Sequence, residues 1–425
     1  YRKIVDVVQG VFIRHVEKSG WPLEGRLANV NVFGQMIAPA LQESGRRVAV
    51  LLIDAMRYEL GVELAKQLSN ENQVDIQAVC AQLPTTTPIG MASLLPGADS
   101  ELVFSKKDNK CIPMLGDQPL TNVSQRMGVL QKRYGQRFAE MELAKFVSKS
   151  KKLDGTVDLL VLRSNEMDND FETNPEAAPS LISRTFRKVL VAIHKLQAFG
   201  FQDAFIVTDH GFYLNTALEP GDVCSKPPGN WVNMHNRMLL GDGTEDASNL
   251  VLSTGQVNIK GDFSQVAVPR ALVAYRASQT YFHGGLSLQE SVVPVLAVRI
   301  RQPETKTMEQ LDITLSYKQG AAKITTRLPV IEISVIGQSG LFSSENSVEV
   351  MLEAHDEKGQ IVGEAKPDGV VDPITRILTL KPGEPVKVTL KMDLRFEGKF
   401  FIKILDPNTQ AARGKQLELE TDYMV

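Results

Sequence analysis

Two stretches of the sequence place metal-binding side chains directly after an apolar run. Residues 48–53 form an uninterrupted apolar run that is followed by Asp54. Residues 204–207 form a second apolar run, which is followed by Thr208 and then by the pair Asp209-His210. Carboxylates and imidazoles are ligands that divalent cations such as Zn²⁺ bind. On its own, Asp54 is more simply read as the cap of the helix that follows it. Because the arrangement recurs at Asp209, we interpret both stretches as parts of one metal site.

A third strand of the same kind brings further acidic residues. Residues 158–163 are followed by Asp168 and Glu172. Apolar runs of this length suit central parallel strands that are covered on both faces. Groups at the carboxyl ends of such strands line the crevice where ligands bind. We therefore expect three strand ends to deliver acidic side chains to one edge of a sheet.

A run of threonines offers a nucleophile. In the segment 84–88, Pro-Thr-Thr-Thr-Pro, the second proline suits the first turn of a helix and places Thr87 at or near its N-cap. An anion is favoured there by the free N–H groups and the helix dipole. A simple capping role is the alternative. If cations held by the nearby strand ends lie within reach, the Thr87 hydroxyl becomes a nucleophile.

The surrounding pattern alternates strands and helices. Helices are predicted at 59–68 and 181–199, a strand at 75–81 and a last strand at 291–298. Strand, crossover helix and strand repeat before residue 210, which is typical of an α/β fold with a parallel, doubly wound sheet. Residues 97–122 are expected to form an irregular active-site loop. From 214 to 285 the pattern loosens, and turn signals dominate.

The ends of the chain differ from this pattern. Residues 1–45 carry two helical patterns, the second over 25–43, and the chain starts inside the first without an initiator Met, so we expect a fragment of a longer protein. After a polar hinge at 301–306, short β-rich runs alternate with turns, as in a small β-sandwich. The predicted division is a helical segment 1–45, an α/β domain 46–305 and an all-β domain 306–425.

Composition excludes several functional classes. The 425 residues exceed the usual size of one core, and 43% apolar with 23% charged residues describe an ordinary globular protein. No apolar run approaches a membrane span. The net charge of −3 and the lack of a basic stretch with interleaved aromatic residues argue against direct nucleic-acid binding. Three cysteines without a CxxC pair favour a reducing cytoplasm.

Four motifs in this order resemble the PglZ family, a branch of the alkaline phosphatase superfamily associated with BREX and Pgl phage-exclusion systems. They are Leu-Ile-Asp54, Pro-Thr-Thr-Thr87-Pro, Thr-Asp209-His210-Gly and His283-Gly-Gly-Leu-Ser-Leu-Gln-Glu-Ser-Val-Val-Pro. The resemblance covers roughly residues 46 to 300. It implies an α/β/α sandwich with a mostly parallel sheet. It also implies hydrolysis of phosphate or sulfate esters by two divalent metals, usually zinc, and a Ser or Thr nucleophile.

In this likeness, Asp54, Asp209 and His210 match the ligands of one metal, which also holds the nucleophile. The threonine run is similar to the pattern of nucleotide pyrophosphatases/phosphodiesterases, and that register makes Thr87 the nucleophile. A slip of register would give Thr85 or Thr86 instead.

The second metal departs from that pattern. The phosphodiesterases have an Asp, a His four residues later and a distant His, whereas this chain has Asp168, Glu172 and His283, with His235 as a possible substitute. Because Glu172 stands where those enzymes have a histidine, the metal can be Zn, Mn or Mg, and the number of bound ions can be one or two. Asn109 lies near the position of an asparagine that steadies a phosphoryl oxygen, offset by one residue.

The resemblance therefore implies a metal-dependent phosphohydrolase, on a phosphodiester rather than a monoester, in a cytoplasmic BREX-type defence system. Its expected partners are the phosphate-ester substrate and other BREX proteins, such as a DNA methyltransferase, and no membrane. The alternative is a non-catalytic scaffold of the defence complex that retains the phosphatase fold. A nuclease is a third possibility, which the lack of a basic stretch disfavours.

Overall fold

The computed structural model describes most of the chain, as residues 2–43, 45–148, 153–176, 178–215, 222–276, 280–301, 312–336, 347–357, 359–373, 376–381, 383–407 and 412–423. It contains two compact units. The first comprises Tyr1–Leu143, Leu153–Thr185 and Gly200–Arg301, and the second comprises Ala144–Lys152, Phe186–Phe199 and Gln302–Val425. Apart from Arg301, the predicted hinge lies outside the described residues, as does the predicted domain boundary at 305/306. None of the described helices is long and apolar enough to cross a membrane.

The first unit is built on a six-stranded sheet with the strand order β2-β15-β8-β1-β7-β6. Strands β1, β6, β7 and β8 are parallel, whereas β15 is antiparallel to both β8 and β2. The predicted mostly parallel sheet is therefore confirmed. The strands are β1 Val48–Ile53, β2 Gln73–Cys80, β6 Phe138–Glu142, β7 Leu159–Ser164, β8 Asp203–Val207 and β15 Val292–Arg299.

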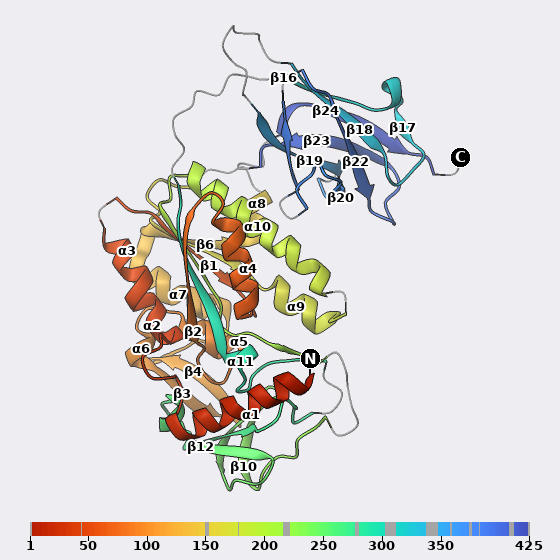
Figure 1. Cartoon of the computed structure of the whole chain (residues 1–425). Coiled ribbons are helices and arrows are strands. Elements are labelled where there is room, and N and C mark those ends of the chain that lie inside the picture. Colours follow the sequence, from red (N-terminus) through yellow and green to blue (C-terminus); the bar gives the residue numbers. More distant parts are fainter. Residues whose placement is uncertain are drawn as a thin grey trace. The chain divides into compact units, whose positions relative to one another are not determined.

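Helices cover both faces of this sheet, as Figure 1 shows for α7 (Val123–Tyr134) on one side and α4 (Tyr58–Leu68) on the other. All six residues of β1 are buried, which accounts for their uninterrupted apolar character. On the α4 side, Gly61 lies so close to Pro294 that a Cβ added to it would be 2.4 Å from the proline Cβ. The result is the α/β/α arrangement that the resemblance implies.

The helical segment at the start of the chain also belongs to this unit. Helix α1 (Arg2–Ser19) is anchored by Gln9, whose Nε2 donates to the Leu286 carbonyl at 2.9 Å. The second helical pattern, expected over 25–43, begins only at Asn29 and contains a π-helical turn, as α2 Asn29–Val32, the turn Phe33–Ile37 and α3 Ala38–Gln42. Pro39 lacks the N–H group that a regular α-helix requires, which explains the local change of hydrogen bonding.

Two regions that were expected to be irregular contain antiparallel sheets. The expected loop 97–122 contains a hairpin of β3 (Leu102–Lys107) and β4 (Lys110–Leu115), with β5 (Gln118–Pro119) beside it. The region 214–285 contains a four-stranded sheet in the order β10-β11-β13-β12. Its strands are β10 Gly229–Met234, β11 Met238–Gly243, β12 Asn249–Ser253 and β13 Gln265–Pro269.

The second unit is β-rich, as predicted. Its strands form one curled nine-stranded sheet around a separate apolar core. They are β16 Asp312–Ser316, β17 Lys323–Ile324, β18 Val330–Ile336, β19 Val348–Asp356, β20 Ile361–Ala365, β21 Ile377–Leu380, β22 Val386–Met392, β23 Lys399–Leu405 and β24 Ala412–Thr421. Parts of α8 (Leu143–Ser148) and α10 (Ala178–Ala198) belong to it, because Val147 and Val191 pack with Met351 and Leu405. The sequence did not predict this helical contribution.

Candidate active site

The first cluster of candidate ligands lies where β1 and β8 end. These strands are neighbours in register, so Asp54 and Asp209 leave the sheet side by side. His210 Nε2 lies 3.3 Å from Asp209 Oδ2 and 3.8 Å from Asp54 Oδ1. All three side chains are buried, and their ligand atoms lie within 4.8 Å of one another. We refer to Asp54, Asp209 and His210 as the inner cluster.

The backbone after β1 turns sharply to build this cluster. Ala55 adopts a positive φ of 59°, which is uncommon for a residue with a side chain, and its N–H donates to Asp209 Oδ1 at 3.2 Å. Helix α4 begins only at Tyr58, with Arg57 at its N-cap position. Asp54 is therefore not the cap of that helix, and the alternative interpretation from sequence is wrong.

The hydrogen bonds of the protein satisfy the buried carboxyl groups of the inner cluster only in part. Asp209 Oδ2 is buried and has no hydrogen-bond partner. Burial raises the pKa of Asp54 well above its usual range, and the charges of Asp209 and Asp168 raise it further. Burial also raises the pKa of Asp209. A buried carboxylate without a partner is costly unless a cation neutralises it, so these residues fit a divalent metal ion.

Of the three threonines, Thr87 has its hydroxyl at the inner cluster. Thr87 Oγ1 donates to Asp54 Oδ1 at 3.4 Å and lies 3.3 Å from His210 Nε2. The hydroxyl of Thr85 instead donates to the Gly285 carbonyl at 2.8 Å. Thr86 occupies the N-cap position of α5 (Thr87–Ser93) and makes no capping bond through its side chain. Thr87 is thus the first helical residue, and its hydroxyl does not cap the helix.

Helix α5 can approach the inner cluster only because residue 90 is glycine. A Cβ at Gly90 would lie 2.6 Å from Asp209 Cβ. We expect Gly90→Ala to destabilise the protein by about 1–3 kcal/mol through overpacking and to weaken metal binding by displacing Asp209. Gly34→Ala is the matched control, because nothing lies within 4 Å of that position. Urea unfolding and metal titration of both variants would test this, and a Gly90→Ala protein indistinguishable from Gly34→Ala would contradict it.

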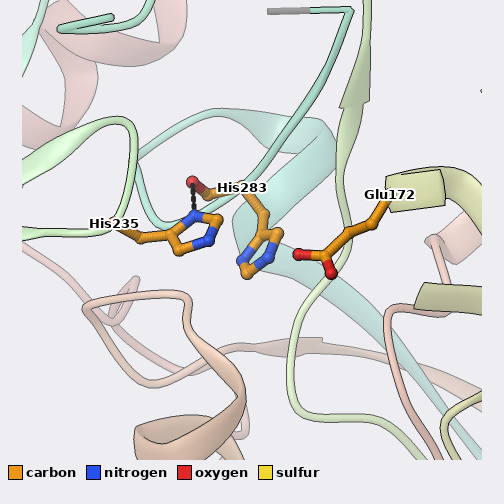
Figure 2. Close-up of side chains that lie close together, drawn as sticks. All are labelled: Glu172, His235 and His283. Atoms are coloured by element: carbon orange, nitrogen blue, oxygen red, sulfur yellow. Dashed lines mark hydrogen bonds between the residues drawn. The ribbon is translucent and has the colours of Figure 1, made fainter. Parts of the chain in front are cut away.

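The second group, the outer cluster, consists of Glu172, His235 and His283. Their ligand atoms also lie within 4.8 Å of one another, and Figure 2 shows the three side chains converging. Glu172 and Asp168 lie one turn apart on α9 (Glu166–Thr173). Asp168 Oδ1 lies 3.9 Å from His283 Nε2. The structure thus brings together the acids predicted from α9 with His283, and it adds His235, which the sequence offered only as a substitute.

The three histidines of the two clusters all use Nδ1 to bind a backbone carbonyl. Nδ1 of His210 donates to the Gly211 carbonyl at 3.0 Å, and Nδ1 of His283 donates to the Thr85 carbonyl at 2.9 Å. His235 donates in the same way to the His283 carbonyl at 3.3 Å (Figure 2). A carbonyl accepts only from N–H, so Nδ1 carries a proton in each ring, and Nε2 is the nitrogen that could bind a metal, as in many metal-bound histidines.

The inner and outer clusters adjoin through stacked rings. The ring centroids of His210 and His283 lie 4.1 Å apart, and those of His235 and His283 lie 4.2 Å apart. Burial lowers the pKa of His283 well below its usual value, and the two neighbouring imidazoles lower it further. His283 is therefore neutral, which is the form that binds a cation.

Sequence reasoning missed two residues near these clusters. The Tyr281 hydroxyl donates to Asp168 Oδ1 at 2.5 Å and fixes that carboxylate. Arg126 of α7 is buried and donates to the Leu120 carbonyl at 3.0 Å. Burial lowers the pKa of Arg126, whereas the charges of Asp209 and Asp54 raise it. Tyr281 could have been noticed from its position two residues before His283, but no local pattern indicates Arg126.

The structure gives Asn109 a role in a turn and shows no contact with either cluster among the described residues. Asn109 is exposed in the turn of the β3–β4 hairpin, and among the described residues its side chain makes no hydrogen bond with either cluster. Asp108 and Asn109 have φ values of 48° and 55°. Two consecutive positive φ angles are what a two-residue hairpin turn needs, and Asp and Asn tolerate them well. The turn accounts for this dipeptide, and the predicted phosphoryl-binding role gains no support.

The layered fold with its mostly parallel sheet defines the protein as alkaline phosphatase-like. Residues 32–298 match the family described as "BREX system PglZ alkaline phosphatase-like domain", and because this is more than half of the chain, the protein belongs to the PglZ family. The resemblance seen in the sequence motifs is confirmed. The match ends before the nine-stranded sheet begins at β16.

Two curated relatives are similar to this chain. The alkaline phosphatase-like protein BrxZ of Escherichia coli O9:H4 (strain HS) is 25% identical over 303 residues, which cover 67% of this chain and 34% of BrxZ. The alkaline phosphatase-like protein PglZ of Bacillus cereus (strain H3081.97) is 24% identical over 335 residues, which cover 74% of this chain and 38% of PglZ. The matched region thus spans little more than a third of each relative.

Proposed function

We propose that this protein is a metal-dependent phosphohydrolase that cleaves a phosphodiester with Thr87 as its nucleophile. The observation that carries the proposal is the position of the Thr87 hydroxyl, within 3.4 Å of both Asp54 Oδ1 and His210 Nε2. A hydroxyl beside two ligand atoms of a buried acidic cluster is where cation-assisted nucleophilic attack requires it. The phosphodiester preference comes from the register of the threonine run in the sequence.

The proposed ligands are the inner cluster for one cation and the outer cluster, with Asp168 beside it, for a second. Their mixture of imidazole and carboxylate suits Zn²⁺ first and Mn²⁺ or Mg²⁺ as alternatives. Bound there, such cations would lower the pKa of the Thr87 hydroxyl and neutralise charge on the phosphoryl group.

The side chains of the protein have separate tasks in this proposal. Thr87 Oγ1 loses its proton and forms the new bond to phosphorus while the bond to one ester oxygen breaks, and that oxygen leaves as an alcohol after taking up a proton. Water then cleaves the resulting threonyl phosphodiester, which releases a phosphomonoester and restores the Thr87 hydroxyl. Tyr281 holds Asp168 in place through its hydrogen bond. The guanidinium of Arg126 interacts electrostatically with Asp54 and Asp209, and in this proposal its positive charge favours binding of a phosphoryl oxygen.

The family and the names of the two relatives support a place in a BREX-type anti-phage system. We propose a cytoplasmic location, because Cys80, Cys111 and Cys224 are all free, as expected in a reducing compartment. Other proteins of the defence system, such as a DNA methyltransferase, are the proposed partners.

The test combines metal analysis with a chromogenic phosphodiester assay. Purified protein is expected to contain zinc or a related cation, to lose hydrolysis in chelator and to regain it when metal is returned. Metal at about 100 times its Kd should stabilise the fold by about 2.7 kcal/mol in urea unfolding. A chromogenic monoester assayed in parallel tests the diester preference. A folded protein that is inactive with Zn, Mn and Mg on every ester would instead be the scaffold alternative.

A further inference from the structure

A completely buried ion pair lies behind the outer cluster. Arg237 Nε lies 3.1 Å from Glu290 Oε2, and neither side chain has exposed surface. Burying two charges is costly unless their geometry is good and further hydrogen bonds satisfy them. A buried ion pair is weak evidence for a purely stabilising role, and the further hydrogen bonds of Arg237 and Glu290 indicate another role.

On the acidic side, Glu290 binds the loop that follows His283. Its Oε1 accepts from the Gly285 N–H at 3.0 Å, and its Oε2 accepts from the Ser287 hydroxyl at 2.6 Å. The loop is also pressed against the arginine, because a Cβ added to Gly285 would lie 2.5 Å from Arg237 Cβ. The position of His283 is therefore tied to the pair through the loop beside it.

On the basic side, Arg237 follows His235 by two residues, in the turn between β10 and β11. Its Nη1 donates to the carbonyls of Ala271 and Val273, at 3.2 Å and 2.8 Å. These bonds fix the turn that carries His235, whose backbone adopts a positive φ of 65°. The two histidines come from distant parts of the chain, and the ion pair joins the segments that carry them.

We infer that Arg237 and Glu290 are positioning residues that set the separation of His235 and His283 and so determine how tightly the outer cluster binds its cation. The inference rests on the proposed function only in assuming that this cluster binds a cation. The inner cluster does not depend on the pair in the same way, because strand ends and the Ala55 N–H place its carboxylates. Loss of the Arg237–Glu290 pair should therefore change the cation affinity of the outer cluster and leave that of the inner cluster unchanged.

The test is a cation titration of the full chain, in which equilibrium dialysis measures how much Zn²⁺ or Co²⁺ the protein binds. Wild type should show two classes of site, and Glu172→Gln identifies the outer one. Arg237→Met is expected to weaken that site by about 10- to 100-fold, as supporting residues around metal ligands typically do, and to leave the other unchanged. Arg237→Lys keeps a positive charge beside Glu290 and should recover part of the lost affinity.

Two further variants separate positioning from stability. Arg237→Met leaves Glu290 charged in the core and can unfold the chain, whereas Arg237→Met with Glu290→Met removes both charges and should fold well. This double variant is still expected to bind the outer cation weakly. Arg187→Met is the control, because it breaks the partly buried Arg187–Glu353 pair of the second unit. It should lower stability and leave both cation affinities unchanged.

A folded double variant with wild-type affinity at both sites would overturn the inference and leave the proposed function intact. A wild-type chain that binds none of Zn²⁺, Co²⁺, Mn²⁺ or Mg²⁺ would instead overturn the proposed function, and the inference with it.

Discussion

Thr87→Ala is expected to bind metal as wild type does and to hydrolyse a phosphodiester at least about 10³-fold more slowly. The inner cluster keeps all its ligands in this variant, whereas the attacking oxygen is gone. Stability should change by less than about 1 kcal/mol, because the Thr87 hydroxyl does not cap α5. Steady-state hydrolysis, metal content and urea unfolding, measured on the same preparation, give the three readouts.

Two control variants make this result specific. Thr87→Ser keeps a hydroxyl in almost the same position and should retain part of the activity. Thr85→Val removes the hydroxyl that bonds to the Gly285 carbonyl, so it should cost about 1 kcal/mol of stability and slow hydrolysis far less than Thr87→Ala does. An Ala variant as active as wild type would remove Thr87 from the reaction.

The inner cluster could be predicted from sequence because its positions follow from local patterns. The apolar runs before Asp54 and Asp209 are continuous, and the carboxyl ends of neighbouring parallel strands meet at one edge. The hydroxyl of Thr87 was assigned by the register of a motif, and the structure shows why its neighbours differ: Thr85 is engaged by a carbonyl and Thr86 sits at the N-cap.

The outer cluster was harder to predict because His235 lies in the turn between β10 and β11, two strands that the sequence pattern does not indicate. Gly229 begins β10, and Gly241 and Gly243 lie in β11, at positions where the neighbouring backbone leaves no room for a side chain. A Cβ at Gly241, for example, would lie 2.0 Å from the Asn230 carbonyl oxygen. Glycine removes the alternation of apolar and polar residues by which strands are recognised. The β3–β4 hairpin was also missed, although its strands contain no glycine, and the role of Asn109 stays a prediction.

Asp209→Asn is expected to change stability in opposite directions without and with metal. In the metal-free protein, the buried Asp209 carboxylate has an oxygen without a partner, and burial raises the pKa of that carboxyl. The neutral amide can still accept from the Ala55 N–H and can donate to a neighbouring carboxylate. In chelator at pH 7, the variant should therefore be more stable than wild type, by about 1–3 kcal/mol.

With metal present, the order should reverse. Wild type gains about 2.7 kcal/mol at 100 times its Kd, whereas the variant loses a ligand and most of that gain, and its hydrolysis falls by at least about 10³-fold. Asp203→Asn, at the other end of β8, is the control: Asp203 pairs with Arg46, so its loss should lower stability equally with and without metal. Urea unfolding of the three proteins in chelator and in zinc distinguishes these outcomes. If Asp209→Asn behaved like Asp203→Asn, the buried carboxylate would be a structural element of β8, and the inner cluster would not be a metal site.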